Sequence, residues 1–478
     1  MPSTSEDPEQ RVPDLSKIVK AYDIRGVVPD ELDEDIARAV GAAFAGFTGA
    51  ATLVTAHDMR TSSGPLSAAF AEGATSQGAD VVEAGLASTD LLYFAAGHLD
   101  VPGAMFTASH NPARYNGIKL CLAGAAPVGQ ESGLAEIRSR AESYLADGLP
   151  GYDGKPGTVS SRDLLTEYAD YLKKLVDLSG SRPLKVAVDA GNGMGGHTVP
   201  VVFAGLPLEV VPLYFELDGT FPNHEANPID PANLRDLQAK VRETGADIGL
   251  AFDGDADRCF VVDERGEVVA PSVLTALIAT RELAREPGAT ILYNLIVSHA
   301  VPEIVRENGG TPERTRVGHS FIKARMAETG AVFGGEHSGH FYFRDFWRAD
   351  SGMLAALHVL AALGEQDRPL SELLAPYSRY AASGEVNSQV EDAPARSAEI
   401  EREYAARAGV SIDHLDGLTV QGDRWWFNLR PSNTEPLLRL NVEAADEATM
   451  TTIRDEVLAR VRAAPAGPEQ PDTRETAK

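Results

Sequence analysis

The chain has 478 residues, of which 43% are hydrophobic and 24% are charged. This composition is typical of a soluble globular protein and excludes a wholly disordered or collagen-like chain, while the length predicts several domains. The formal net charge of −27 argues against a general nucleic-acid or anionic-membrane binder, because both present negative surfaces. If the protein binds anionic small molecules, its cations must be concentrated in one cleft.

The expected compartment is a reducing one. The chain has two cysteines, Cys121 and Cys259, which are too few for a stabilising disulfide framework. The polar first residues contain no apolar core of a secretory signal, and the longest apolar stretches, such as the one from Met353, are too short to span a membrane. A cytoplasmic protein with no membrane or nucleic-acid partner is therefore expected.

Three segments repeat the same pattern along the chain. The segments that begin at Ala51, Leu184 and Ala289 each open with an apolar strand and a polar turn, and continue with a helical pattern and a second strand. Strands that alternate with helices in this way form sheets covered by helices. The repetition predicts three similar α/β domains with mixed sheets.

After about residue 375 the pattern changes to short alternating strands and a final amphipathic helix from Glu447, which predicts a smaller C-terminal α+β domain. The last stretch is rich in Pro, Ala and charge without periodicity, so we expect it to be disordered, together with the first dozen residues. The expected domains cover residues 1–158, 159–266, 267–375 and 376–463, and the expected disordered tail covers 464–478.

The first motif is TASHNPARYNGIKL, from Thr107 to Leu120, a polar loop bounded by apolar residues. Within it, Ser109 offers a hydroxyl nucleophile, and His110 and Lys119 offer cations beside it. An ordinary Asn-Pro turn with Ser109 as a cap explains the same residues. The loop alone leaves both interpretations open.

The second motif is DGDADR, which lies between two strand-like segments. Its carboxylates at alternate positions, Asp253, Asp255 and Asp257, can converge on one small hard cation, and Arg258 limits the surplus negative charge. An acidic hairpin turn is the alternative, but carboxylates crowded between apolar strands repel one another without a cation. The later glycine and glutamate of an EF-hand loop are missing, and the flanks are strands. The motif therefore predicts a metal site of another kind.

The third motif is GGEHSGH, from Gly334 to His340, which lies between the strand-like segments AVF and FYF. Its Glu336, Ser338 and His340 are suited to hydrogen bonding with sugar hydroxyls. A plain bulge or hairpin turn would look the same.

The fourth motif is RPSNTEP, which begins at Arg430. The guanidinium of Arg430 offers a planar fork of donors, and Ser432, Asn433 and Thr434 add hydroxyl, amide and backbone N–H groups that suit a phosphate dianion. A Pro-Ser-Asn turn is the alternative.

In this set and order, the motifs resemble those of the α-D-phosphohexomutase superfamily, and the resemblance extends from AYDIRG, which begins at Ala21, to RPSNTEP. It implies four domains around one central cleft, with Ser109 carrying a phosphoryl group. It also implies that Mg²⁺ is bound by the aspartates of DGDADR and by an oxygen of phosphorylated Ser109. Glu336 and Ser338 match residues that bind the sugar 3- and 4-hydroxyls. The other matched active-site positions are Tyr22, Arg25, His110, Lys119, Arg258, His319 and His340, and the matched phosphate-binding loop comprises Arg430, Ser432, Asn433 and Thr434.

The implied reaction is the reversible interconversion of hexose 1-phosphate and hexose 6-phosphate. It passes through a phosphoserine and a hexose 1,6-bisphosphate, which also serves as the activator. The cations Lys119, Arg25 and Arg258 would stabilise the transferring phosphoryl group, and His340, Lys119 and Arg25 are candidates for proton transfer. The bisphosphate must turn around between the two transfers, and the fourth domain must open and close. The expected partners are sugar phosphates, and the expected state is a monomer or homodimer.

The loop GEHSGH is similar to the GExSGH form of bacterial phosphomannomutase/phosphoglucomutase enzymes. Phosphoglucosamine mutases usually carry GEQSGH, so that activity ranks second. A non-catalytic sugar-phosphate-binding protein is a third interpretation, but it would be expected to have lost the nucleophile or a metal ligand. A Mg²⁺-dependent phosphatase would need a water activator that the motifs do not supply. One departure is Ile296, which stands where many relatives carry a basic residue that reaches the site.

Overall fold

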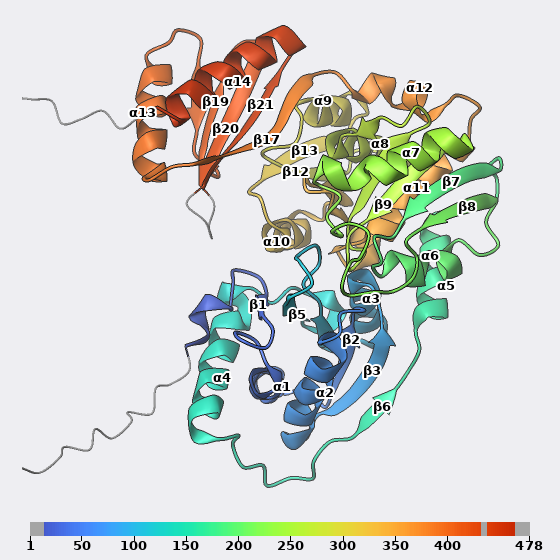
Figure 1. Cartoon of the computed structure of the whole chain (residues 1–478), viewed down its shortest axis with the longest axis vertical. Coiled ribbons are helices and arrows are strands. Elements are labelled where there is room, and N and C mark those ends of the chain that lie inside the picture. Colours follow the sequence, from blue (N-terminus) through green and yellow to red (C-terminus); the bar gives the residue numbers. More distant parts are fainter. Residues whose placement is uncertain (1–13, 432–436, 464–478) are drawn as a thin grey trace, which may run out of the picture. The chain divides into compact units, whose positions relative to one another are not determined.

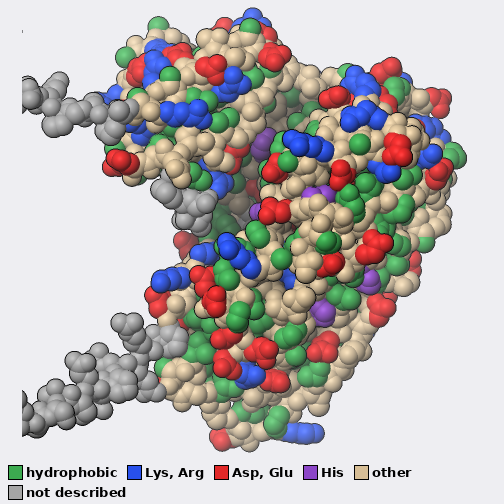
Figure 2. Space-filling model, in the orientation of Figure 1, with side chains coloured by type: hydrophobic (Ala, Val, Ile, Leu, Met, Phe, Trp, Pro, Cys, Tyr) green, Lys and Arg blue, Asp and Glu red, His purple; other side chains and the backbone are tan. Residues whose placement is uncertain are grey.

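The computed structural model describes residues 14–431 and 437–463, without the side chains of residues 319 and 320. The chain divides into two compact units, Met1–Ser378 and Arg379–Lys478 (Figure 1). The disorder expected for the first dozen residues and for 464–478 falls outside the described residues. Figure 2 shows acidic and basic side chains interspersed over the visible face, so the net charge of −27 is not gathered in one patch there.

The first sheet of the N-terminal unit has the strand order β1-β5-β4-β2-β3-β6 and is drawn in blue to cyan in Figure 1. The pairs β2–β3, β2–β4 and β3–β6 are parallel, whereas β5 is antiparallel to both β4 and β1. The loop with Ser109 connects β4 to β5, and the pairing of Met105 with Lys119 keeps this lysine beside the loop. The elements are β1 (Ile24–Val27), α1 (Glu34–Thr48), β2 (Thr52–His57), α2 (Ser63–Ser76), β3 (Asp80–Leu86), α3 (Thr89–Leu99), β4 (Gly103–Phe106), β5 (Tyr115–Cys121), α4 (Ala135–Asp147) and β6 (Val159–Ser161).

The second sheet has the order β11-β10-β9-β7-β8, with β7, β8 and β9 parallel and β10 antiparallel to β9. Strands β9 and β10 are buried along their whole length, which explains their apolar sequence up to Asp263 at the end of β10. Their last pair, Phe252 with Cys259, closes the turn formed by DGDADR. The elements are α5 (Leu165–Leu175), β7 (Leu184–Asp189), α6 (Gly195–Val202), β8 (Leu208–Leu213), α7 (Arg235–Thr244), β9 (Ile248–Phe252), β10 (Cys259–Asp263) and β11 (Val268–Val269).

The third sheet has the order β13-β12-β14-β15-β16 and is also mixed. The antiparallel pair of Gly335 with Phe341 closes the turn formed by GEHSGH. The apolar stretch from Met353 is the buried helix α11, and none of the described helices is long and apolar enough to cross a membrane. The elements are α8 (Pro271–Arg285), β12 (Thr290–Asn294), α9 (Ala300–Glu307), β13 (Thr311–Thr315), α10 (His319–Thr329), β14 (Phe333–Gly335), β15 (Phe341–Phe343), β16 (Ala349–Asp350), α11 (Gly352–Gly364) and α12 (Leu370–Leu374).

The C-terminal unit is an antiparallel sheet of order β17-β21-β20-β19-β18 with helices α13 and α14. The buried rings of Tyr404 and Phe427 meet edge to face in its core, with centroids 4.9 Å apart. Mixed α/β sheets followed by a smaller α+β domain confirm the predicted fold class. The elements are β17 (Ala381–Gln389), α13 (Ala393–Ala405), β18 (Ser411–Asp413), β19 (Leu418–Gln421), β20 (Trp425–Pro431), β21 (Leu437–Ala444) and α14 (Glu447–Val461).

Candidate active site

The loop between β4 and β5 holds Ser109 in an unusual conformation. Its φ of 50° lies in the left-handed region, which non-glycine residues adopt rarely and mostly where the surrounding structure enforces it. Thr107 Oγ1 accepts a hydrogen bond of 2.9 Å from the Ser109 backbone N–H, and the Ser109 side chain is almost fully buried. The sequence motif thus marks a strained, fixed hydroxyl rather than a free surface turn.

Arg60, which follows β2, holds this loop in place through hydrogen bonds. Arg60 is 3% exposed, and its guanidinium pairs with Asp58 and donates hydrogen bonds to several backbone carbonyls of the loop. The acceptors are the carbonyl oxygens of Ser109, Asn111, Pro112 and Tyr115, at 2.7 to 3.0 Å. Sequence reasoning missed Arg60, because a single arginine after a strand carries no signal of its distant partners.

The DGDADR turn, the predicted metal site, lies directly against Ser109. Ser109 Oγ donates a hydrogen bond to Asp253 Oδ2 at 2.7 Å, and Arg258 Nη2 lies 3.2 Å from the same hydroxyl oxygen. A Cβ at Gly254 would lie only 2.4 Å from the Ser109 carbonyl oxygen, so the close approach of the two loops requires glycine there. The first two motifs are therefore parts of one site.

The aspartates of DGDADR form a buried cluster. Carboxylate oxygens of Asp253, Asp255 and Asp257 lie within 4.8 Å of one another, and these side chains are at most 1% exposed. Arg258 Nε donates to Asp253 at 2.8 Å, and Lys119 Nζ donates to Asp255 at 2.9 Å and to Asp257 at 2.6 Å. Among the described residues, none offers a hydrogen bond to the buried Oδ1 atoms of Asp255 and Asp257. A hard divalent cation such as Mg²⁺ fits this set of oxygens.

Burial and charge give these aspartates different acidities. Burial raises the pKa of Asp253, and the Asp257 and Asp255 carboxylates add to the rise, while Arg258 opposes it. Burial would also raise the pKa of Asp255, but Lys119, Thr89 and Arg258 hold it well below its usual range. Without a cation, the cluster therefore keeps a proton on Asp253 more readily than on Asp255.

His110 does not provide the positive charge that the sequence predicts beside Ser109. Burial, together with the charges of Arg258 and Arg25, lowers the pKa of His110 well below its usual value, so the ring is neutral at neutral pH. Its Nδ1 contacts Arg258 Nη2 and lies 3.3 Å from Ser109 Oγ. The prediction was wrong because a neighbouring guanidinium, invisible in the local motif, already supplies the charge.

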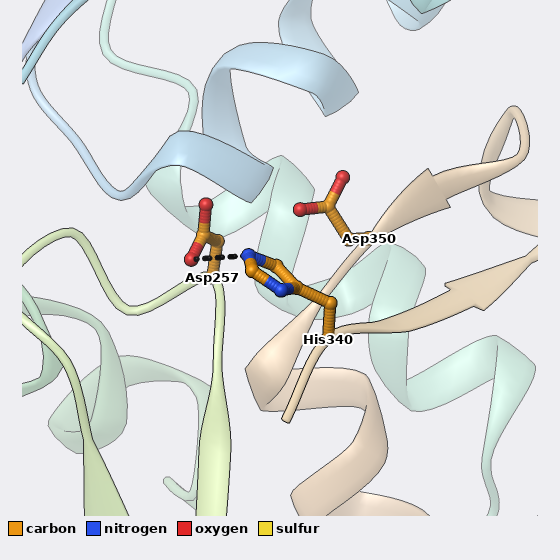
Figure 3. A group of neighbouring side chains, drawn as sticks. All are labelled: Asp257, His340 and Asp350. Carbon is orange, nitrogen blue, oxygen red and sulfur yellow. Dashed lines mark ion pairs between the residues drawn. The ribbon is translucent and has the colours of Figure 1, made fainter. Parts of the chain in front are cut away.

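The third motif contacts the DGDADR turn through His340. His340 Nε2 lies 3.6 Å from Asp257 Oδ1, and Figure 3 shows the ring pointing toward Asp257, with Asp350 beside it on the neighbouring strand. Ser338 Oγ lies 2.9 Å from His340 Nδ1. Buried Glu336 accepts hydrogen bonds from Asn294 Nδ2, the Gly318 N–H and Tyr342 OH. These contacts fix Glu336 and its turn beside the aspartates.

Lys323 on α10 is a buried cation near the site that the motifs do not include. Its Nζ lies 2.7 Å from Asp350 Oδ1 and 3.9 Å from the centroid of the Tyr93 ring. The side chains of Lys323 and Asp350 are 2% and 4% exposed. The sequence offers no signal for this pair, since it joins a helix to a short strand through the fold.

Arg25 and Tyr22 approach the site from the N-terminal strand region. Arg25 Nη1 donates to Asn111 Oδ1 at 2.9 Å, which brings this cation to the Ser109 loop, and Nη2 pairs with Asp23 at 2.5 Å. The Tyr22 ring packs edge to face on Phe321 of α10, with centroids 6.0 Å apart. His319 begins α10, and its side chain lies outside the described residues.

The fourth motif lies in the C-terminal unit, between β20 and β21. Arg430 is the last residue but one of β20, and its guanidinium lies 3.7 Å from Glu385 and 3.8 Å from Asp416. The matched residues Ser432, Asn433 and Thr434 lie outside the described residues. Ile296 is 7% exposed in the N-terminal unit, so this position contributes apolar packing.

Comparison with known proteins assigns the chain to a family. Family models match consecutive stretches of it: phosphoglucomutase/phosphomannomutase alpha/beta/alpha domain I over residues 16–146, domain II over 166–266, domain III over 271–380 and the C-terminal domain over 385–460. A phosphomannomutase of Escherichia coli is 40% identical over 453 residues, which are 93% of this chain and 98% of the relative. A protein of Xanthomonas campestris pv. campestris named phosphohexose mutases is 41% identical, with 92% and 98% covered.

A solved structure agrees with these matches. The crystal structure of a phosphoglucomutase/phosphomannomutase family protein from Burkholderia thailandensis superposes with a TM-score of 0.83 at 33% identity, covering 93% of this chain and 97% of that one. The matches span nearly the whole length of each relative, and they include every domain in the same order. The chain therefore belongs to the phosphoglucomutase/phosphomannomutase family.

Proposed function

We propose that this chain is a phosphohexomutase that interconverts hexose 1-phosphate and hexose 6-phosphate, with mannose or glucose as the sugar. The observation that carries the proposal is the contact of Ser109 Oγ with Asp253 Oδ2 at 2.7 Å, inside a cluster of carboxylates with unused oxygens. A nucleophilic hydroxyl held beside a divalent-cation site is the arrangement that phosphoryl transfer needs. The names of the relatives, phosphomannomutase and phosphohexose mutases, support the same substrate class.

Asp253, Asp255 and Asp257 are the proposed ligands of Mg²⁺, with an oxygen of phosphorylated Ser109 completing the site. When bound there, Mg²⁺ would neutralise negative charge on the phosphoryl oxygens. Arg258, whose Nη2 lies 3.2 Å from Ser109 Oγ, would stabilise charge on the same phosphoryl group. Lys119 holds Asp255 and Asp257 in place and adds positive charge at the edge of the cluster.

His340 is the proposed acid and base for the sugar hydroxyl. Burial would lower the pKa of Lys119, but Asp255 and Asp257 raise it well above its usual value in the metal-free protein, and its ammonium group donates hydrogen bonds to both carboxylates. Arg25 presents only N–H donors, which suits it to binding negative charge. An imidazole can both accept and donate a proton near neutral pH. The position of His340, between Asp257 and Ser338, supports this assignment.

The sugar and its second phosphate are proposed to bind through residues shared by both orientations of the bisphosphate. Glu336 and Ser338 would bind the sugar hydroxyls, and Tyr22, His110 and His319 would line the site around them. The distal phosphate would be bound by Arg430, Ser432, Asn433 and Thr434. With these contacts shared, hexose 1,6-bisphosphate can turn around and present its other phosphate to Ser109, and it also serves as the activator. The cytoplasmic location and the monomeric or homodimeric state stay predictions from the sequence.

The test compares mannose 1-phosphate, glucose 1-phosphate and glucosamine 1-phosphate as separate substrates, each with Mg²⁺ and the matching bisphosphate. We expect the highest kcat/KM with mannose or glucose, and a clear preference for glucosamine 1-phosphate would overturn that choice. Ser109→Ala is expected to abolish turnover, whereas Ser143→Ala, on the exposed face of α4, is expected to leave it unchanged. Substantial turnover by Ser109→Ala would refute the phosphoserine mechanism.

A further inference from the structure

Thr89, the first residue of α3, belongs to the same domain as Ser109 and contacts the aspartate cluster of the DGDADR turn. We infer that Thr89 is a positioning residue for the metal site: its hydroxyl orients Asp255 so that Oδ1 of this carboxylate faces the cation. The inference rests on the metal site proposed above and adds to it a residue that belongs to none of the motifs.

Thr89 binds Asp255 at two points. Its backbone N–H donates to the Asp255 carbonyl oxygen at 3.0 Å, and its Oγ1 donates to Asp255 Oδ2 at 2.6 Å. Both residues are fully buried. The first bond fixes the peptide of the turn and the second fixes the plane of the carboxylate, because an aspartate side chain has only two torsions. Water cannot replace either bond without entering the core.

The two oxygens of Asp255 are used differently. Oδ2 accepts hydrogen bonds from Thr89 Oγ1 and from Lys119 Nζ at 2.9 Å. In the described part of the chain, Oδ1 is buried without a hydrogen-bond donor. A carboxylate oxygen left in this state is costly unless a cation coordinates it. Thr89 and Lys119 together therefore direct the free lone pairs of Asp255 to the place where the other aspartates converge.

The position of Thr89 is fixed by hydrogen bonds of its neighbour Asp90 to residues of other domains. Its neighbour Asp90 is fully buried and accepts hydrogen bonds from Ser88 Oγ at 2.5 Å, Tyr168 OH at 2.7 Å and Ser351 Oγ at 2.6 Å. Tyr168 belongs to α5 and Ser351 caps α11, so α3, α5 and α11 meet at one carboxylate. The start of α3 consequently cannot shift without breaking contacts to the second and third sheets' helices.

The same geometry couples the nucleophile to the cation site. Thr89 begins the helix that precedes β4, Ser109 follows β4, and each contacts the DGDADR turn, Ser109 at Asp253 and Thr89 at Asp255. Two contacts at alternate residues fix both the distance and the rotation of the turn relative to the Ser109 loop. Removing a residue that donates a hydrogen bond to a metal ligand typically weakens metal binding by about 10- to 100-fold.

The experiment measures Mn²⁺ binding to the unphosphorylated full chain by electron paramagnetic resonance of free Mn²⁺, without any sugar phosphate. Mn²⁺ reports on the site because it prefers the same oxygen ligands as Mg²⁺. We expect Thr89→Val, which keeps the shape but loses the hydroxyl, to weaken binding by about 10- to 100-fold. Thr89→Ser, which keeps the hydroxyl, should stay within about threefold of wild type.

Thr198→Val is the matched control, since Thr198 is equally buried and its hydroxyl donates to the Met194 carbonyl oxygen inside the second domain at 3.1 Å. It should leave Mn²⁺ affinity unchanged. Thr89→Ala replaces Thr89→Val if the latter does not fold, as judged by circular dichroism. The role of Thr89 would be overturned if the folded hydroxyl-free variant bound Mn²⁺ like the wild type, or if Thr198→Val lost as much affinity. Either outcome would leave the proposed metal site standing. Absence of Mn²⁺ binding by the wild type would instead refute the metal site and this inference with it.

Discussion

Ser109 Oγ and Asp253 Oδ2 lie 2.7 Å apart although 144 residues separate them in the chain. The contact joins a loop of the first sheet to a turn of the second, and both residues are almost fully buried. The hydroxyl of Ser109, the proposed nucleophile, donates to the carboxylate of Asp253, a proposed metal ligand. Burial raises the pKa of this carboxylate. Metal binding, proton release and nucleophile geometry are therefore coupled in this site.

Mg²⁺ binding is expected to release protons and to strengthen as the pH rises. Burial and the neighbouring Asp257 and Asp255 carboxylates raise the pKa of Asp253, so part of the metal-free protein holds a proton there near neutral pH. The cation needs the ionised carboxylate, and binding must displace that proton. Calorimetric titrations in buffers of different ionisation enthalpy should give up to about one proton released at pH 7. The affinity should level off above the raised pKa.

The Asp253→Asn variant provides the comparison. It cannot ionise, so its residual binding of Mg²⁺ should be weak and should show little dependence on pH. A wild-type affinity that is constant from pH 6 to pH 9, with no buffer dependence of the heat, would contradict the coupling.

Arg60→Lys is expected to damage the Ser109 loop although Arg60 belongs to no motif. The lysine keeps the charge but loses the fork of donors that reaches the loop carbonyls. Losing hydrogen bonds to a charged group typically costs about 1.5 to 3 kcal/mol of unfolding free energy, and the misplaced hydroxyl should lower kcat by at least about tenfold. Urea unfolding and initial rates measure the two effects.

Arg140→Lys is the matched surface control, because Arg140 makes an exposed helical ion pair with Glu136 at 2.5 Å. Such pairs contribute about 0.3 to 0.5 kcal/mol, so stability and kcat should hardly change. If Arg60→Lys behaved like this control, the role of Arg60 in holding the loop would be disproved.

The contrast between the motifs and Arg60 explains what the sequence can predict here. DGDADR and GEHSGH are polar segments between apolar runs, so the local pattern places them in the turns that β9–β10 and β14–β15 form. Their identity as chemical sites also follows from residue type. The contacts of Arg60 and Thr89 depend instead on how separate sheets and helices pack, and no local spacing records that.

The state of His110 could not be predicted from its motif for a related reason. Its neutrality depends on burial and on Arg258, which is 148 residues away in the sequence. In the same way, the motif that contains Arg430 is visible in the sequence, while most of its loop lies outside the described residues. Residue chemistry is thus readable from the chain, whereas charge states require the packed structure.

His358 is expected to destabilise the fold in acid. It is buried on α11, stacked on Phe343 with centroids 5.2 Å apart, and burial, with Arg281 and Arg285, lowers its pKa to about 3. Because the folded pKa lies below the unfolded value of about 6.5, stability is intact above that pH and falls as the pH drops toward 3. The effect amounts to at most about 5 kcal/mol at about 1.4 kcal/mol per pKa unit.

The His358→Phe variant keeps an aromatic ring against Phe343 and removes the titration. Urea unfolding at pH 7, 5 and 4 should show the stability of the wild type falling relative to the variant as the pH decreases. A constant difference between the two proteins over this range would show that His358 is not held neutral by the fold.

The Lys323–Asp350 ion pair tests how strongly the core beside the site depends on charge balance. Lys323→Met would remove the cation 2.7 Å from buried Asp350, next to the already acidic cluster that contains Asp257. Removing one member of a buried pair typically costs about 3 to 5 kcal/mol, since the remaining charge loses its partner, whereas removing both is often nearly neutral. The double variant Lys323→Met/Asp350→Asn should therefore recover much of the stability that Lys323→Met loses. The four proteins of this double-mutant cycle, compared by urea unfolding, give the coupling energy directly. A coupling close to zero would mean that Asp350 is compensated by other groups and that the cation of Lys323 is dispensable to the site.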